Sequence, residues 1–312
     1  MQPFEPVSFL NAQGLRLAGS LHRPREARPD SPAVILLSPG VKMRVGPGRL
    51  YVPITQLLNE QGYTVLRFDF YGLGDSEGEL GESQLIDIYN HVEVGRYVED
   101  TLSAMRYLRE THGFRNFMLG GLCGGATTAA LTAERDASVT HLLCVGLAIA
   151  LSSDAATPAR YLTRVELDSR RKMYFKRLLE PKSWLRLLTF QSEYGVIWRS
   201  LKRLVIKDKA QKQTSVSEPV KSPALENANP LFPPAFFAFL RRGGKALLLF
   251  SENDRLPSEF EEKFTLPYAA SLEPFLPQMT SHVVPRANHV LSMPEWRKEA
   301  LDVCRQWLGK TA

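Results

Sequence analysis

The chain opens with alternating apolar and polar residues and then changes to short runs that are apolar throughout. The alternating segment "PVSFLNAQGLRLAGSLHRP" predicts two strands that turn at Gln13-Gly14 and form an antiparallel hairpin at a sheet edge. The apolar runs lie at residues 33–39, 63–70, 116–121, 141–150 and 245–252. Strands that are apolar on both faces are typical of parallel sheets covered by helices on each side.

Helical segments separate these runs. They read "LYVPITQLLNEQG", "VGRYVEDTLSAMRYLRETHG" with a stop at Gly113, "CGGATTAALTAERD", and "PEWRKEALDVCRQWLGK" beginning at Pro294. The order of strands and helices predicts an α/β protein whose mostly parallel, doubly wound sheet is entered through an antiparallel hairpin.

Residues 151–231 interrupt this alternation. They contain amphipathic stretches such as "RRKMYFKRLLEPKSWLRLLTF" and then the polar "KDKAQKQTSVSEPVKSPALENANP". We therefore expect a core of residues 1–150 and 232–312, with a helical lid insertion at 151–231 that returns through a flexible connector.

The insertion carries the basic excess of the chain. Residues 151–230 hold 16 Lys or Arg against 8 Asp or Glu, a net charge of +8, whereas the whole chain is +6. This favours a surface that attracts an acidic substrate, carrier protein or lipid headgroup, with a solvated helix face as the alternative. No nucleic-acid-binding signature accompanies the charge, so nucleic acid is not an expected partner.

The composition of the chain narrows the classes of protein to which it can belong. The longest apolar run, 142–151, is far shorter than the roughly 20 residues of a membrane helix, and the first residues lack the features of a secretory signal. We expect a cytoplasmic protein. The three cysteines, Cys123, Cys144 and Cys304, have unrelated spacings, which predicts neither a disulfide framework nor a metal site; Cys144 and Cys304 are expected in the core.

The segment "GLCGG" carries the strongest chemical signal. It fits G-x-nucleophile-x-G, the sharp turn between a strand and a helix, with Cys123 in place of the usual serine. The glycines two before and two after Cys123 are expected because side chains there would collide. A thiol at a helix N-terminus beside an imidazole has a lowered pKa, so Cys123 is the candidate nucleophile.

Two further residues follow in the order nucleophile, acid, histidine. Asp254 comes directly after a predicted strand, with Asp154 as the alternative acid, and His289 lies in the loop before the last helix. His289 would act as the base and Asp254 would orient it. The other histidines are expected to have structural rather than catalytic roles; His282, for example, is expected within the last strand.

The remaining candidate site residues bind the developing oxyanion or the substrate. The amides of Gly124 and Val41 are the expected oxyanion donors. Lys42 and Arg44 follow in a loop that we interpret as an anion-reading element, with a flexible surface loop as the alternative. In the insertion, Trp184, Tyr194 and Trp198 are candidate pocket residues, or else they pack the lid onto the core.

The segment "RFDFYGLGDSEG" resembles the D-x-x-G-x-G-x-S turn of the serine-aminopeptidase and lysophospholipase-like α/β-hydrolases. More closely, "RVGPGR", the elbow "GLCGGA" and "YFKRLLEPKSWLRLL" are similar to segments of the exosortase A system-associated hydrolases, a bacterial branch linked to exopolysaccharide gene clusters. The resemblance implies an α/β-hydrolase fold and ester, thioester or amide acyl chemistry without metal or organic cofactor.

The residues themselves predict a cysteine-dependent acyl hydrolase or acyltransferase that forms an acyl-Cys123 intermediate. Thiolates react readily with activated acyl groups, so the expected substrate is a small or carrier-bound thioester or activated ester. The competing hypothesis is a catalytically inactive hydrolase scaffold that binds a partner through the basic lid.

Overall fold

The computed structural model describes residues 4–81, 85–151 and 227–311. Contacts along the chain divide it into two units, Met1–Tyr161 with Asn227–Ala312 and Leu162–Glu226, and the described residues belong to the first. Trp184, Tyr194, Trp198 and Asp154 lie outside the described residues, as does most of the predicted insertion.

Eight strands of the described residues form one sheet in the order β1-β2-β4-β3-β5-β6-β7-β8. Their bounds are β1 (Phe4–Leu10), β2 (Arg16–His22), β3 (Ala33–Leu37), β4 (Val65–Phe68), β5 (Phe117–Leu122), β6 (Val139–Val145), β7 (Lys245–Ser251) and β8 (Met279–Val284). Strand β2 pairs antiparallel with β1 and β4, and all other neighbours are parallel. The predicted edge hairpin and doubly wound sheet are confirmed.

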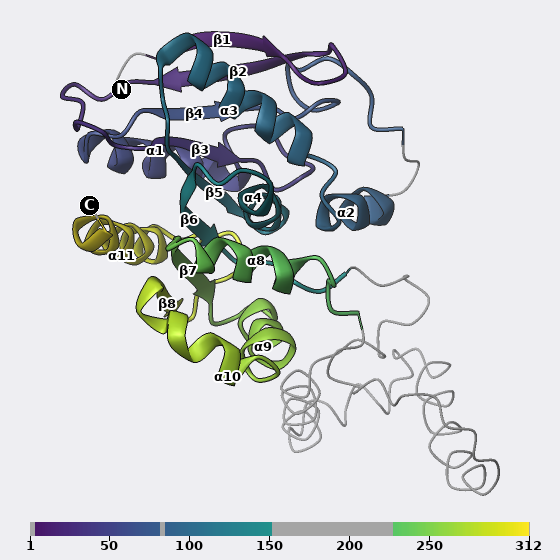
Figure 1. The fold of residues 1–312 in the computed structure, drawn as a ribbon, viewed down its shortest axis with the longest axis vertical. Coiled ribbons are helices and arrows are strands. Elements are labelled where there is room, and N and C mark those ends of the chain that lie inside the picture. The colour runs from purple at the N-terminus through teal and green to yellow at the C-terminus, as the bar shows by residue number, and fades with distance from the viewer. Residues whose placement is uncertain (1–3, 82–84, 152–226, 312) are drawn as a thin grey trace, which may run out of the picture. The chain divides into compact units, whose positions relative to one another are not determined.

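Helices cover both faces of this sheet (Figure 1). Apolar side chains of α2 (Leu85–Glu93), α3 (Val98–His112), α4 (Gly124–Arg135), α8 (Phe232–Arg241) and α9 (Leu256–Phe260) pack into one core cluster. Those of α1 (Tyr51–Glu60) and α11 (Pro294–Thr311) pack into the cluster on the other face. Shorter turns of helix complete the chain at η1 (Pro47–Arg49), η4 (Glu261–Thr265), α10 (Ala269–Leu272) and η5 (Glu273–Gln278). None of the helices in the described ranges has the length and apolar character needed to cross a bilayer.

Most predicted elements form, with changes at their ends. The helix predicted from "VGRYVEDTLSAMRYLRETHG" forms α3 from Val98 to His112, and Gly113 directly after it has φ +75°, as a helix-terminating glycine should. The strand predicted at 141–150 was too long, because β6 ends at Val145 and Gly146 follows with φ +53°. This left-handed residue turns the chain off the sheet edge, and the apolar residues after it are buried without forming a strand.

The chain returns to the core earlier than the sequence predicts. Residue 227, placed within the insertion by the sequence analysis, accepts a backbone hydrogen bond from Leu151 at 2.8 Å, and Asn229 donates one to Ile149 at 2.8 Å. Ala150 and Ala228 form an antiparallel bridge. The two chain segments that flank residues 152–226 therefore meet side by side.

Candidate active site

Cys123 occupies the turn between β5 and α4 with a strained backbone. Its φ of 53° and ψ of −120° lie outside the conformations that residues with a side chain readily adopt. Its amide donates to the carbonyl oxygen of Val145 at 2.9 Å, and its carbonyl accepts from the amides of Ala126 and Thr127. This is the geometry expected of an elbow that presents a side chain at the edge of the sheet.

The two outer glycines of "GLCGG" are required for this turn. A Cβ on Gly121 would lie 2.6 Å from the carbonyl carbon of Gly125, and a Cβ on Gly125 would lie 2.3 Å from the carbonyl oxygen of Leu37. Both contacts are with backbone, which cannot move aside as a flexible side chain can. Helix α4 therefore packs against β3 and β5 at a distance that only glycine allows, as the sequence predicted.

His289 and Asp254 lie together at the same end of the sheet. Asp254 follows β7, and His289 lies in the segment between β8 and α11. The Nδ1 atom of His289 is 2.6 Å from Oδ2 of Asp254, whose Oδ1 also accepts a hydrogen bond from the amide of Arg255 at 2.8 Å. Gly146 lies next to the imidazole, because a Cβ there would be in ordinary contact with Cε1 of His289 at 3.5 Å.

Asp254 and the Cys123 thiol raise the pKa of His289 from 6.5 to about 10. Each acts through a hydrogen-bond contribution and through its negative charge, and partial burial of the imidazole opposes the shift. The imidazole therefore favours its protonated form at neutral pH. A protonated imidazole in this position can deliver a proton to a leaving group.

The other two cysteines have no comparable setting. Cys144 in β6 and Cys304 in α11 are buried, and burial raises the pKa of each thiol to about 12. The sequence-based prediction that both belong to the core is confirmed. His282 lies within β8, as predicted, with its Nε2 atom 2.8 Å from Oε1 of Glu299.

The segments that carry the two expected oxyanion donors meet at Val92 of α2. A Cβ on Gly40 would lie 2.8 Å from Cγ2 of Val92, and a Cβ on Gly124 would lie 2.7 Å from its Cγ1. One buried side chain thus packs against both the loop before Val41 and the residue after the elbow. Helix α2 was not predicted from the sequence, although its apolar residues Ile88 and Val92 recur at the i, i+4 spacing of a buried helix face.

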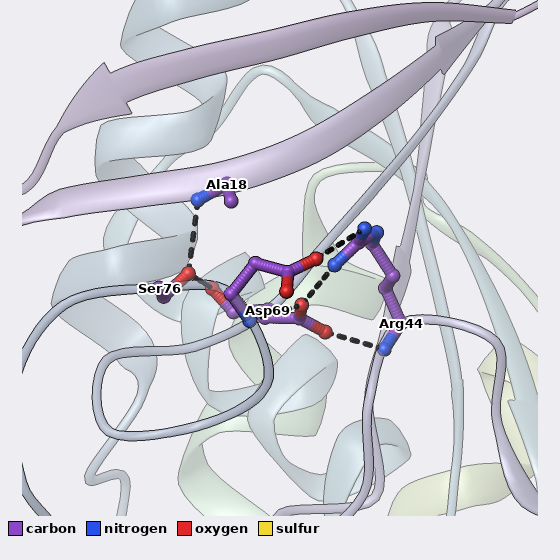
Figure 2. Close-up of polar contacts among 5 residues, drawn as sticks. Ala18, Arg44, Asp69 and Ser76 are labelled. Atoms are coloured by element: carbon purple, nitrogen blue, oxygen red, sulfur yellow. Dashed lines mark hydrogen bonds and ion pairs between the residues drawn. The ribbon is translucent and has the colours of Figure 1, made fainter.

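Arg44 is held by two acidic side chains (Figure 2). Its guanidinium pairs with Asp69 and, at 2.7 Å, with Asp75, while its amide donates to Asp69 Oδ1 at 2.6 Å. These contacts raise the pKa of Arg44 despite the opposing effect of burial. Neighbouring Lys42 is exposed. The loop after β3 is therefore fastened to the turn after β4 by Arg44.

Asp69 belongs to the D-x-x-G-x-G-x-S segment, and its carboxylate side chain is fully buried. A Cβ on Gly74 would lie 2.2 Å from Oδ2 of Asp69, so glycine makes space for this carboxylate. The Ser76 hydroxyl donates to the carbonyl oxygen of Asp69 at 2.6 Å and accepts from the amide of Ala18 at 2.9 Å (Figure 2). The motif thus holds together β2, the turn after β4 and the loop after β3.

No group of three His, Cys, Asp or Glu side chains suited to a metal ion occurs in the part of the chain that the structure describes. The geometry at the end of the sheet consists of Cys123, His289 and Asp254, flanked by the backbone of residues 40–41 and 124.

Comparison with solved structures identifies the fold. An esterase from Pyrococcus furiosus is 15% identical, with a TM-score of 0.57 over 99% of this chain and 91% of that chain. A proline iminopeptidase from Mycobacterium smegmatis is 16% identical, with a TM-score of 0.55 over 98% of each chain. The esterase domain of a Rhodothermus marinus protein is 17% identical, with a TM-score of 0.51 over 99% of each chain. At these identities the similarity shows the α/β-hydrolase fold alone.

A search of curated proteins finds no match to the sequence. The model of the family described as serine aminopeptidase, S33, matches residues 29–197, which is more than half of the chain and includes the elbow. The chain therefore belongs to the serine aminopeptidase S33 family of α/β-hydrolases.

Proposed function

We propose that this protein is a cysteine-dependent acyl hydrolase or acyltransferase with Cys123 as nucleophile, His289 as acid and base, and Asp254 as the group that orients His289. The observation that carries the proposal is the position of His289, whose Nδ1 atom lies 2.6 Å from Oδ2 of Asp254, and whose pKa is raised by both Asp254 and Cys123. This position supports a relay from Asp254 through His289 to Cys123, the strained residue of the elbow.

In the first half of the reaction, the Cys123 thiolate attacks the acyl carbon. The carbonyl π electrons move onto oxygen, and the amides of Gly124 and Val41 are the proposed donors to this oxyanion. When the intermediate collapses, the bond to the leaving group breaks and His289 supplies its proton. The products of this half are acyl-Cys123 and a free thiol or alcohol.

In the second half, His289 removes a proton from water or from an acceptor hydroxyl, amine or thiol, and the acceptor atom attacks acyl-Cys123. Collapse of this second intermediate releases the acyl product and restores the thiolate and the imidazolium. Asp254 keeps its charge throughout and holds Nδ1–H so that Nε2 faces the reaction.

The cysteine favours a thioester or activated ester as substrate. A thiolate expels another thiolate or a good alkoxide leaving group much more readily than an amine, so peptide bonds are less suitable substrates. The family includes proteins described as aminopeptidases, and similar structures include esterases. We therefore propose a small or carrier-bound acyl thioester.

Lys42 extends the proposal to the leaving group. It is exposed in the loop that carries Val41, whereas the guanidinium of Arg44 is bound by Asp69 and Asp75. Lys42 is thus better placed than Arg44 to attract a negatively charged substrate, and the primary role proposed for Arg44 is to hold the loop.

The segments "RVGPGR" and "GLCGGA" also support membership of the exosortase A system-associated branch of α/β-hydrolases. In that setting the acyl reaction would serve bacterial exopolysaccharide production. Sequencing the genes that flank this one tests the assignment, because genes for polysaccharide synthesis should lie beside it.

Intact-protein mass spectrometry after brief mixing with acyl thioesters and activated esters tests the chemistry. The wild type should gain one acyl mass on Cys123, whereas Cys123→Ala and His289→Ala should not, and Cys304→Ala serves as the matched cysteine control. Release of thiol or alcohol is followed in parallel to detect fast deacylation. Neither an adduct nor release would instead favour a scaffold protein.

A further inference from the structure

Two buried tyrosine hydroxyls hold the backbone on either side of the proposed oxyanion site. We propose that Tyr97 and Tyr51 are positioning residues that aim the oxyanion-binding amides of Val41 and Gly124. This inference rests on the proposed acyl chemistry and adds residues that neither the elbow motif nor the triad includes.

Tyr97 acts on the peptide that contains the Val41 amide. Its hydroxyl donates to the carbonyl oxygen of Gly40 at 3.2 Å, and this oxygen and the Val41 nitrogen belong to the same planar peptide unit. Fixing the oxygen therefore fixes the direction of the N–H on the opposite side. Donation to the carbonyl also polarises the peptide and strengthens its N–H as a donor.

The surroundings of Tyr97 suit this role. The residue is fully buried, and its ring stacks on Phe70 with centroids 4.1 Å apart and planes within 3°. Gly40, in contrast, has φ +86° and no side chain of its own to define its conformation. A rigid aromatic ring thus supports the most adaptable residue of the loop.

Tyr51 joins the base of that loop to the nucleophile's strand. Its hydroxyl donates to the carbonyl oxygen of Leu37 at 2.6 Å and accepts from the amide of Leu122 at 2.7 Å. Leu37 is the last residue of β3, from which the loop departs, and Leu122 directly precedes Cys123. One hydroxyl therefore sets the separation of the two segments that bear the donors.

Burial keeps this hydroxyl in the form that can both donate and accept. Tyr51 is 1% exposed, and burial raises its pKa well above the ordinary range, with the nearby Cys123 adding to the shift. Tyr51 thus stays neutral at neutral pH, and its hydroxyl can make both hydrogen bonds.

An oxyanion site depends closely on alignment, because its donors must lie about 2.7–3.1 Å from the developing charge. Loss of a whole donor in such sites costs about 100- to 1000-fold in kcat. Loss of a hydroxyl that aims a donor should cost less, and we expect acylation of Tyr97→Phe and of Tyr51→Phe to slow by about 10- to 100-fold.

The experiment compares acylation with a reaction of the same thiol that forms no oxyanion. Acylation of Cys123 by a thioester is measured for wild type, Tyr97→Phe and Tyr51→Phe, alongside alkylation of Cys123 by iodoacetamide. Tyr63→Phe is the matched control, since Tyr63 is 3% exposed and its hydroxyl contacts Arg28. We expect acylation to fall in both test variants while alkylation and the control stay within about twofold of wild type.

A second measurement covers variants that fold poorly. The ratio of rates with an oxygen ester and its thiono analogue, measured on the titrated active fraction, reports on the oxyanion site because sulfur is a weak acceptor for its donors. Loss of folded protein lowers both rates equally and leaves the ratio unchanged. Misaligned oxyanion donors slow the oxygen ester more than its thiono analogue, so the ratio of the oxygen-ester rate to the thiono-ester rate falls.

Unchanged acylation in both variants would overturn the positioning role and leave the acyl chemistry standing. The same conclusion would follow if acylation and alkylation fell together while the ratio of oxygen-ester to thiono-ester rates stayed unchanged. A wild-type protein that is alkylated but never acylated would overturn the acyl chemistry, and the positioning role with it.

Discussion

The carboxylate of Asp254 lies 2.6 Å from Nδ1 of His289, although 35 residues separate them along the chain. This contact is the largest cause of the raised pKa of His289. It gives the proposed reaction a characteristic dependence on pH.

Asp254→Asn should lower acylation by about 100-fold or more and shift its pH profile. In the wild type, His289 keeps its proton up to about pH 10, so leaving-group protonation should fail only above that pH. Without the carboxylate, the pKa of His289 falls back toward 6.5, and the alkaline limb should move to lower pH. Acylation rates measured between pH 6 and 11 test this.

The control for this prediction is Asp302→Asn, which removes a surface carboxylate paired with Lys298 and Arg305. Its pH profile should match that of the wild type. An alkaline limb that stays in place in Asp254→Asn would show that Asp254 does not set the protonation of His289.

The three cysteines should differ in reactivity toward iodoacetamide. Burial raises the pKa of Cys144 and Cys304 to about 12, so both thiols should stay protonated and covered in the native protein at pH 8. Peptide mapping should find the label on Cys123 alone, and on all three cysteines after unfolding. Native labelling of Cys144 at the rate of Cys123 would contradict the packing described here.

Arg44→Met should lower the free energy of unfolding by roughly 3 kcal/mol, because the buried Asp69 carboxylate loses its guanidinium partner. Lys42→Met, in the same loop but at an exposed position, should change stability by no more than about 0.5 kcal/mol. Denaturant unfolding measures both. The double variant Arg44→Met with Asp69→Asn should recover part of the loss, and no recovery would argue against the ion pair as its cause.

Lys42 should instead affect substrates by their charge. For a thioester with an anionic leaving group, Lys42→Met should lower kcat/KM by about threefold to tenfold at low ionic strength, and the effect should fade in high salt. A neutral thioester serves as the comparison substrate. Equal losses for both substrates at every salt concentration would remove the proposed electrostatic role of Lys42.

Gly125→Ala should lower the free energy of unfolding by about 1–3 kcal/mol, since the new methyl group would meet the carbonyl oxygen of Leu37 at 2.3 Å. The same substitution at Gly309, in α11 with no atom within 4 Å, should stabilise by up to about 1 kcal/mol. Opposite signs in thermal or denaturant unfolding are expected. A Gly125→Ala protein as stable as the wild type would show that α4 can shift freely.

The sequence led to the three proposed catalytic residues through signals that are local or follow chain order. Cys123 was recognisable from glycines two residues away, and Asp254 from the strand directly before it. His289 followed from chain order in the fold. Cys123 and Asp254 stand close to the end of a strand, and such ends leave a clear pattern in the sequence.

The features of the fold and the site that were not predicted from the sequence depend on contacts between residues far apart in the chain. The hydroxyl of Tyr97 reaches Gly40 across 57 residues, and Arg44 meets Asp69 across 25. No spacing rule connects these pairs, and either Tyr97 or Arg44 could equally have faced solvent or substrate. The return of the chain at Asn227 was missed for the same reason, because a short backbone bridge has no periodic pattern.

The bridge between residues 149–151 and 227–229 has a consequence for how the gene can change. Since the chain leaves and rejoins the core at adjacent hydrogen-bonded positions, a sequence of another length could be exchanged between these positions without altering the path of β6 or α8. Recombination at these two points would exchange the sequence between them while keeping Cys123, His289 and Asp254 in place. The same two points are natural boundaries for building chimaeric enzymes.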